Sequence, residues 1–446
     1  MTDLSNLTNL LNLILLYLMY LVVSFWLFNG NFLSPSFVFS TAMSLTLCLA
    51  YYAAVNMEML FAINFRTFWI FGFAGFIFLA TEFFVYAMHT VKVLDRGSCL
   101  DSSLNLNIKH QPLLIDKQIQ WAFTAILALS FLLALIVLYL NTGGGSFSQR
   151  MNEYKVLVLH DTGRLRGRFI VSQIYKINFA GINLFGYVMV YNLVLCNAKI
   201  REVLSYIIDA VLYALFSSVY NGARQSAIEV LLFLITVYMA LNMKPGGRQK
   251  IYFFIIKMIP VLVLVMCLFT AAGDLVGRNL GKKSALQNLI EYACGGIYAF
   301  NFHIDEGAST KFFGEMSFAY AYSAFQKLGL MPYGGPTTAV QFDLYGNTLT
   351  IFGKWYRDFG AVGVFIMTFL VSLSYSSVFY GKIIHSGNLT KEHHITRIFY
   401  CQFMMALILA GYDDRISAMM TMQTVTFLIF VVILYKLLIV DKLKIF

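Results

Sequence analysis

Residues 10–29 read LLNLILLYLMYLVVSFWLFN, and residues 120–140 read QWAFTAILALSFLLALIVLYL. Neither stretch contains an Asp, Glu, Lys or Arg residue. A helix of about 20 predominantly apolar residues is what crosses the hydrocarbon core of a bilayer, and both stretches have that length. The first is also too long for the core of a cleavable signal, and no Lys or Arg precedes it. Both are therefore predicted to be membrane-spanning helices.

Nine further apolar runs resemble these two, and the whole composition agrees with them. The chain is 59% apolar and 12% charged, whereas about 25% of the residues in an ordinary globular domain are charged. We therefore expect an all-α, polytopic integral membrane protein that forms a single membrane domain over residues 1–446. About 11 transmembrane helices are predicted, of which the fifth and tenth are the weakest: 10–29, 34–55, 68–88, 120–140, 179–196, 202–220, 226–242, 251–272, 360–380, 397–412 and 419–440.

Three connections between these runs are long, namely 89–119, 141–178 and 273–359. The last contains apolar residues at helical spacing over 286–294 and 312–319, so short amphipathic helices on the membrane surface are expected there. Lys and Arg cluster in the short loops that an eleven-span arrangement places on one side, and that side is predicted to be cytoplasmic. The 273–359 loop is then external, on the periplasmic side.

The connection 141–178 falls on the same external side although its net charge is +4. Either the span count is wrong in the N-terminal half, or this cationic patch serves an anion. The net charge of the whole chain is +10, but most Lys and Arg lie between apolar runs. Membrane lipids and topology account for that pattern, and no nucleic-acid partner is expected. None of the six cysteines forms a CxxC pair, so no metal site is predicted.

Four ionisable residues, Glu82, Asp209, Glu229 and Lys257, fall inside predicted spans. Such residues clamp helices together or line a water-filled cavity, and both interpretations stay open for each. The turn that contains Arg224, between the sixth and seventh runs, is predicted to be external. It is an anion site or a plain interfacial anchor.

The 273–359 loop is not generally basic, because seven Lys and Arg stand against seven Asp and Glu. It combines cations, carboxylates, one histidine and many aromatic residues. Carboxylates and amides bind sugar hydroxyls, aromatic faces stack on sugar rings, and arginine matches phosphate oxygens. The composition of this loop is that of a sugar–phosphate site.

A short stretch after this loop resembles a known family. Asn347 and Thr350, followed by Tyr356, Asp358, Gly360 and Gly363, give the pattern N-x-x-T … Y-x-D-F-G-x-x-G. This is similar to a stretch of the bacterial oligosaccharide repeat-unit polymerases of the O-antigen polymerase (Wzy) type. The Gly222-Ala-Arg224 turn and the Ser34-Pro35 start of the second run also resemble that family.

The resemblance implies a GT-C-like fold and a membrane-embedded glycosyltransferase in the bacterial cytoplasmic (inner) membrane, with its active face external. Such enzymes polymerise undecaprenyl-pyrophosphate-linked oligosaccharide units into O-antigen or a similar polysaccharide. Neither a metal nor another cofactor is implied, and a chain-length regulator is a possible partner. Two alternatives stay open: an O-antigen ligase-like glycan transferase, and a flippase or transporter of the lipid-linked oligosaccharide.

Roles for individual residues follow from the charge that develops in this reaction. Displacement of pyrophosphate leaves negative charge that fixed cations stabilise. Arg224 and Arg357 are the first candidates because each lies where an external loop meets a span, and Arg278 is the third. The acceptor hydroxyl needs a base or an orienting group, and the candidates are His303, Asp305 and Glu306.

Overall fold

The computed structural model describes residues 4–57, 59–95, 110–160, 165–222, 225–243, 285–307, 310, 313–330, 349–384 and 391–442. Over these residues the chain is built from helices and their connections, with no β-strand. The prediction of an all-α protein is therefore confirmed for the part of the chain that is described.

Eight helices are long and apolar enough to cross a membrane. This confirms a polytopic membrane protein. The eight are α1 (Leu4–Leu27), α2 (Pro35–Asn56), α3 (Phe65–Asp95), α4 (Lys117–Asn141), α6 (Arg168–Leu195), α7 (Ile200–Asn221), α12 (Ile351–Val378) continued by η3 (Phe379–Ile383), and α15 (Met422–Tyr435) continued by η4 (Lys436–Val440).

The other three predicted spans are not among these eight helices. The run 226–242 forms α8 (Gln225–Leu241), which is apolar but has only 17 residues. The run 397–412 lies mostly in α13 (Lys391–Ile408), which is not among the eight apolar helices. The run 251–272 lies outside the described residues. The count of eleven thus stays a prediction.

The fifth span begins earlier than predicted. Helix α6 starts at Arg168 rather than near residue 179, so the connection before it is shorter than 141–178. Polar residues in its first three turns keep the local hydropathy low, but Asn178 is buried and its amide donates to the Ser130 hydroxyl on α4 at 2.8 Å. A polar residue satisfied by a neighbouring helix is compatible with the membrane interior.

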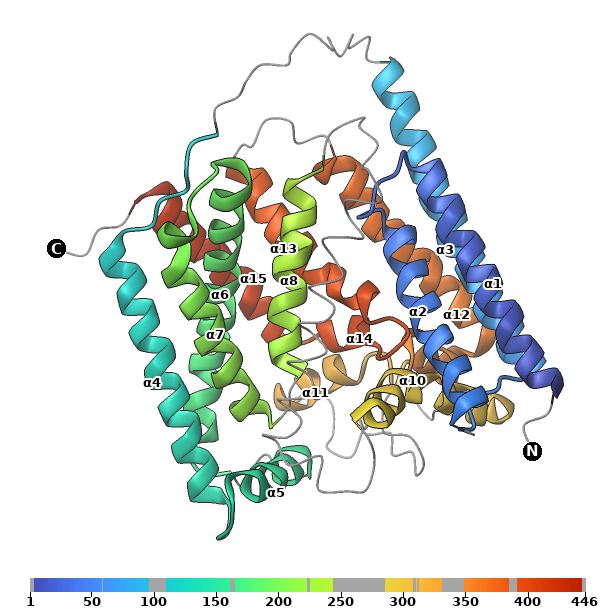
Figure 1. The fold of residues 1–446 in the computed structure, drawn as a ribbon, viewed down its shortest axis with the longest axis horizontal. Helices are drawn as coiled ribbons and strands as arrows, with labels where there is room; N and C mark the ends of the chain where they lie inside the picture. Colours follow the sequence, from blue (N-terminus) through green and yellow to red (C-terminus); the bar gives the residue numbers. More distant parts are fainter. Residues whose placement is uncertain are drawn as a thin grey trace.

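The helices pack as two groups with α13 between them (Figure 1). Helices α1, α2, α3 and α12 form one group, and α4, α6, α7, α8 and α15 form the other, while α13 contacts both α2 and α8. Aromatic rings fill both groups. Phe39 stacks on Phe78 in the first, and Phe123 stacks on Phe185 in the second, each with ring centroids 4.4 Å apart.

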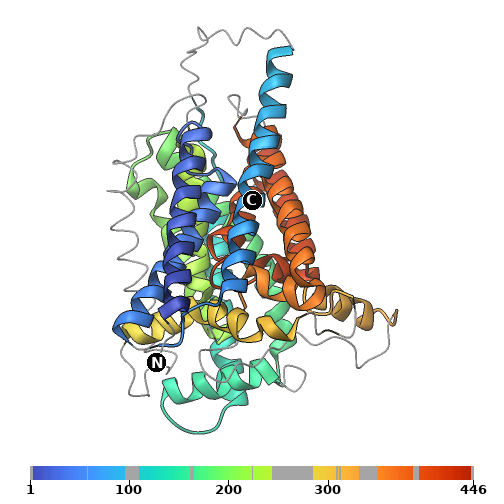
Figure 2. The same ribbon diagram turned by 90° about the vertical axis from the view of Figure 1, so that its right-hand side faces the viewer.

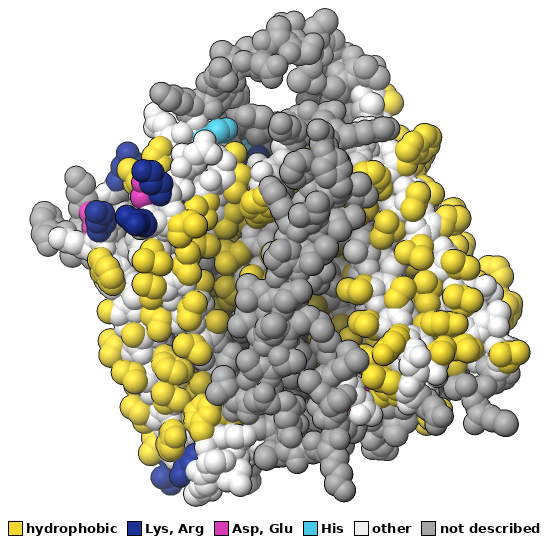
Figure 3. Space-filling view, viewed as in Figure 1, with side chains coloured by type: hydrophobic (Ala, Val, Ile, Leu, Met, Phe, Trp, Pro, Cys, Tyr) yellow, Lys and Arg dark blue, Asp and Glu magenta, His cyan; other side chains and the backbone are white. Residues whose placement is uncertain are grey.

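The outer surface has the polarity expected for contact with lipid. On the face shown in Figure 3, apolar side chains cover the flanks of the bundle, and the visible Lys and Arg side chains lie toward its two ends. Large apolar residues such as Trp26, Trp69 and Trp121 are more than half exposed. Exposed apolar belts of this size occur where lipid replaces water as the solvent.

Two of the ionisable residues inside spans act as clamps between helices. The Glu82 carboxylate on α3 accepts hydrogen bonds from the Ser36 amide at the start of α2 and from the Tyr380 hydroxyl in η3. The Asp209 carboxylate on α7 accepts a hydrogen bond from the Thr124 hydroxyl on α4 at 2.6 Å. Lys257 lies outside the described residues.

Three helices lie at one end of the bundle, the end at which α1 begins (Figures 1 and 2). They are α5 (Phe147–His160), α10 (Ala285–His303) and α11 (Ala319–Lys327). Helix α10 contains the amphipathic stretch 286–294. The second stretch was predicted wrongly as a helix, because residues 313–318 form turns. Gly314 has a φ of +64°, which breaks a helix there.

Candidate functional site

The N-x-x-T part of the motif leads into the start of α12, where three segments meet. The Ile351 amide donates to the Ala410 carbonyl, and the Asp414 amide donates to the Leu349 carbonyl, both at 3.0 Å. Helix α10 approaches the same point so closely that a Cβ on Gly296 would lie 2.8 Å from the Thr350 nitrogen. Thr350, the N-cap residue of α12, therefore lies where α10 and the connection after α13 meet α12.

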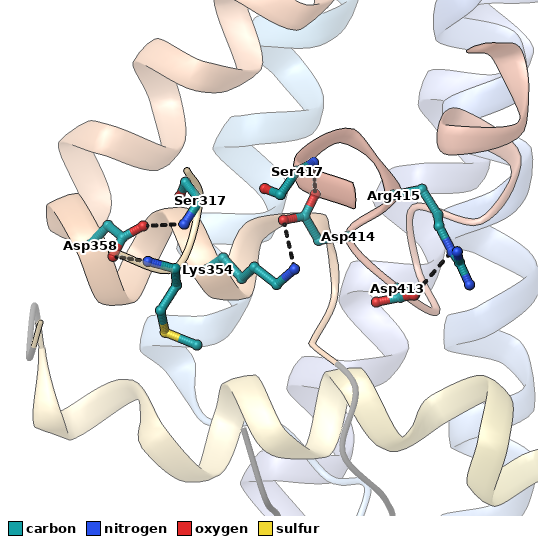
Figure 4. Close-up of polar contacts among 8 residues, drawn as sticks. Ser317, Lys354, Asp358, Asp413, Asp414, Arg415 and Ser417 are labelled. Carbon is teal, nitrogen blue, oxygen red and sulfur yellow. Dashed lines mark hydrogen bonds and ion pairs between the residues drawn. The ribbon is translucent and has the colours of Figure 1, made fainter. Parts of the chain in front are cut away.

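The D-F-G-x-x-G part of the motif forms a bend in α12. The Asp358 carboxylate accepts hydrogen bonds from the amides of Met316 and Ser317, at 3.0 and 2.6 Å (Figure 4). Gly360 has φ +68° and ψ −165°, a region that is essentially restricted to glycine. A Cβ on Gly363 would lie 2.0 Å from the Cβ of Phe359. The two glycines thus determine the shape of the helix, and Asp358 binds residues 316–317 of the preceding loop to it.

Tyr356, also in the motif, connects α12 to two other helices. Its buried ring contacts Phe300 of α10, and its hydroxyl donates to the Ile304 carbonyl at 2.7 Å. Arg66 at the start of α3 lies over the ring at 5.9 Å. Tyr356 thus joins α12 to the end of α10 and to the start of α3.

A buried ion pair lies one turn into α12 (Figure 4). The Lys354 ammonium is 3.6 Å from the Asp414 carboxylate, whose side chain is fully buried. Asp414 is also the N-cap of the short helix α14 (Arg415–Met419), because its carboxylate accepts a hydrogen bond from the Ser417 amide at 3.1 Å. Burial raises the pKa of Asp414, and Lys354 and the Ser417 bonds act against that increase.

The next residue extends the charged cluster to α8. The Arg415 guanidinium contacts the Asp413 carboxylate through Nε at 3.0 Å and the Glu229 carboxylate through Nη1 at 3.4 Å. About a fifth of each of these three side chains is exposed. We refer to Glu229, Lys354, Asp413, Asp414 and Arg415 as the charge network. It joins α8, α12 and α14.

A cavity of about 390 Å³ opens beside this network. Its walls come from α6, α7, α8, α11, α13, α14 and α15, and the lining includes aromatic rings of α6 and α15. A volume of this size is within the usual range for small-ligand pockets, about 300–1,000 Å³. The polar side chains in the lining include Asn221, Glu229, Tyr320, Gln402, Arg415 and Gln423.

The predicted bases do not line this cavity where their side chains are described. His303 ends α10, and Asp305 follows in the 3-10 turn Ile304–Glu306. Asp305 is largely exposed and lies 3.8 Å from Arg66; such an exposed pair contributes little to stability. The side chain of Glu306 is outside the described residues.

The predicted pyrophosphate ligands are described only in part. Arg357 is half-buried on α12, and its carbonyl accepts a weak hydrogen bond from Thr310 at 3.5 Å. Arg224 and Arg278 lie outside the described residues, as does Asn347. Just before Arg224, Gly222 ends α7 with a φ of +59°, and a Cβ there would lie 3.1 Å from the Cα of Lys155. Helix α5 thus packs directly against Gly222 at the end of α7.

Sequence reasoning missed the Asp413-Asp414-Arg415 triplet. These residues fall in the connection between the tenth and eleventh predicted spans and were given no role. The signal available was three consecutive charged residues between apolar runs, next to the aromatic Tyr412. Glu229 was recognised as an ionisable residue within a span, but its partner was not.

The described residues contain no group of three or more His, Cys, Asp or Glu side chains that could hold a metal ion. Comparison of the chain with protein-family models, curated proteins and solved structures finds no match. The function must therefore be argued from the residues themselves.

Proposed function

We propose that the protein polymerises undecaprenyl-pyrophosphate-linked oligosaccharide units into O-antigen or a similar surface polysaccharide. Glycosyl transfer takes place at the outer face of the bacterial cytoplasmic membrane. The observation that carries the proposal is the cavity beside the charge network, because it combines aromatic rings, amides, hydroxyls and a carboxylate within an apolar helix bundle. A sugar that is attached to a lipid needs this combination.

Two further observations support this function. The motif that resembles the polymerase family builds the start and the bend of α12, and Lys354 of the charge network lies between its two parts. The helices α10 and α11 of the longest connection lie at the end of the bundle toward which α7 runs, and α11 contributes Tyr320 to the cavity. Substrate at the membrane surface would reach the cavity from this end.

The proposal is tested by the glycans that cells make without the protein. Cells that lack it should carry single repeat units on the lipid acceptor, and gels of their glycans should show no long ladder. Loss of an O-antigen ligase-like transferase would instead leave long polymer on the lipid carrier. An unchanged ladder would refute both glycan-transfer functions.

A second candidate, a flippase or transporter of the lipid-linked oligosaccharide, is favoured by one observation. A charged contact joins two helices of the bundle, because the Glu229 carboxylate on α8 lies 3.4 Å from the Arg415 guanidinium on α14. Ionisable residues within membrane-spanning segments mark substrate and ion pathways in transporters. Loss of a flippase would leave the lipid-linked units on the inner leaflet, where an external glycosidase cannot reach them.

A further inference from the structure

We propose that Glu229 is the proton acceptor for the attacking sugar hydroxyl, and that the cavity beside it binds the uncharged acceptor sugar rather than the pyrophosphate. This inference rests on the proposed glycosyl transfer and assigns one half of the reaction to a described site. It depends on the charge balance of the network, the exposure of its carboxylates and the lining of the cavity.

The charge balance argues against an anion in the cavity. The network contains two cations and three carboxylates, which leaves a formal charge of −1 if all are ionised. Both cations already contact carboxylates, Lys354 at 3.6 Å and Arg415 at 3.0 and 3.4 Å. A pyrophosphate at Arg415 would have to displace a carboxylate from a partly desolvated ion pair, which is unfavourable. An uncharged sugar needs no such displacement.

Only one of the three carboxylates is placed to accept a proton from a ligand. The Asp414 carboxylate is fully buried and bonds to Lys354 and to the Ser417 amide. Asp413 contacts Arg415 but does not line the cavity. Glu229 lines the cavity, and about a fifth of its side chain is exposed. Its contact with Arg415 favours the ionised form that a base requires.

The other side chains of the lining are suited to a sugar. The amides of Asn221, Gln402 and Gln423 both donate and accept hydrogen bonds. The aromatic rings of Tyr175 and Phe427 line the cavity, and apolar ring surface suits the C–H side of a pyranose. These groups hold a sugar hydroxyl near Glu229 without contributing charge.

The transfer forms one bond and breaks one. The acceptor hydroxyl oxygen forms a bond to the anomeric carbon of the donor glycan, and the bond from that carbon to the pyrophosphate oxygen breaks. The bonding electron pair leaves with the pyrophosphate. The hydroxyl proton passes to the Glu229 carboxylate and is then released to water. Arg415 is a positioning residue, since it orients the carboxylate and does not touch the reacting atoms.

The experiment uses the full chain in lipid nanodiscs with the lipid-pyrophosphate-linked repeat unit. Glu229→Gln keeps the shape of the side chain and removes the base. We expect its kcat to fall by about 10²–10⁴-fold, while KM changes by only a few-fold. Glu229→Asp retains a carboxylate one methylene further back and should recover part of the loss. The wild-type kcat should also fall at acidic pH, and this acidic limb should be absent from Glu229→Gln.

The matched control is Asp209→Asn. Asp209, like Glu229, is a carboxylate within a predicted span that bonds to a neighbouring helix, but it does not line the cavity, so the kcat of this variant should stay within a few-fold of wild type. The role of Glu229 would be overturned if Glu229→Gln kept most of the wild-type kcat, or if the substitution raised KM without lowering kcat. A Glu229→Asp protein as inactive as Glu229→Gln, but with a lowered melting temperature, would indicate a purely structural role and also overturn it. Failure of the wild type to form any polymer would instead refute the proposed function itself.

Discussion

Replacement of Gly360 by alanine tests the bend in α12 with a single methyl group. The backbone at Gly360 has φ +68° and ψ −165°, and a non-glycine residue in such a region costs about 1–3 kcal/mol. No heavy atom lies within 4 Å of the Cβ that alanine would add. The methyl group therefore collides with nothing, and the whole expected loss comes from the backbone conformation.

Gly381 provides the matched control. A Cβ at this position is equally free of neighbours, but Gly381 lies within the helical turn η3 and has no positive φ. Alanine there should stabilise the protein by about 0.5–1 kcal/mol. The two single-methyl variants should therefore differ in free energy of unfolding by about 1.5–4 kcal/mol.

The assay is reversible unfolding of the purified protein in mixed detergent micelles, as the SDS fraction is increased. Tryptophan fluorescence is a suitable signal because Trp355 is fully buried five residues before the bend. Equal stability of the two variants, within about 0.5 kcal/mol, would show that the bend does not require glycine. The structural account of the D-F-G-x-x-G motif would then be wrong.

Three further predictions concern the charge network and the proposed chemistry. Lys354→Met should destabilise the protein by about 3–5 kcal/mol, because it leaves the buried Asp414 carboxylate without its cation. Burial raises the pKa of Asp414, so the folded variant takes up a proton more readily than the unfolded chain. Its stability should then increase as pH falls, and unfolding titrations should show a smaller deficit at about pH 5 than at about pH 8. Arg357→Lys should lower the polymerisation rate about 100-fold if its fork of donors contacts the leaving pyrophosphate. Arg164→Lys, in the cationic 141–178 connection, should change the rate little, because long-range attraction of an anion needs only the charge. Polymerisation by purified protein should persist in excess EDTA; complete loss that a divalent ion restores would contradict a mechanism based on arginine.

The spans that were predicted well are those in which the residues of the segment are themselves apolar throughout. Residues 10–29 and 120–140 are apolar throughout, and each lies within a long helix, α1 or α4. The start of α6 could not be predicted from the segment alone, because it depends on a residue of another helix. Its first turns contain Lys176 and Asn178, and the amide of Asn178 is satisfied by Ser130 on another helix. A hydropathy window cannot detect that compensation.

The candidate site was harder to predict because its parts are distant in sequence. Glu229 and Lys354 lie on two different helices, and they reach Arg415 and Asp414, respectively, only after the bundle has formed. Each residue by itself is compatible with a span end or a loop. The motif residues were recognised, but their pattern does not reveal that Asp358 and Gly360 shape a helix whereas Lys354, which lies between the two parts of the motif, belongs to the charge network.

The close approach at Gly296 constrains how this protein could be recombined with others. A Cβ at residue 296 would meet backbone atoms of Thr350 and of Tyr412 within 3 Å, so the three backbones are fitted to one another. Grafting α10 alone into a different bundle would separate surfaces that match only in this chain. A functional chimera would have to exchange α10, the first turn of α12 and the connection after α13 as a single block, even though these segments span more than a hundred residues of sequence.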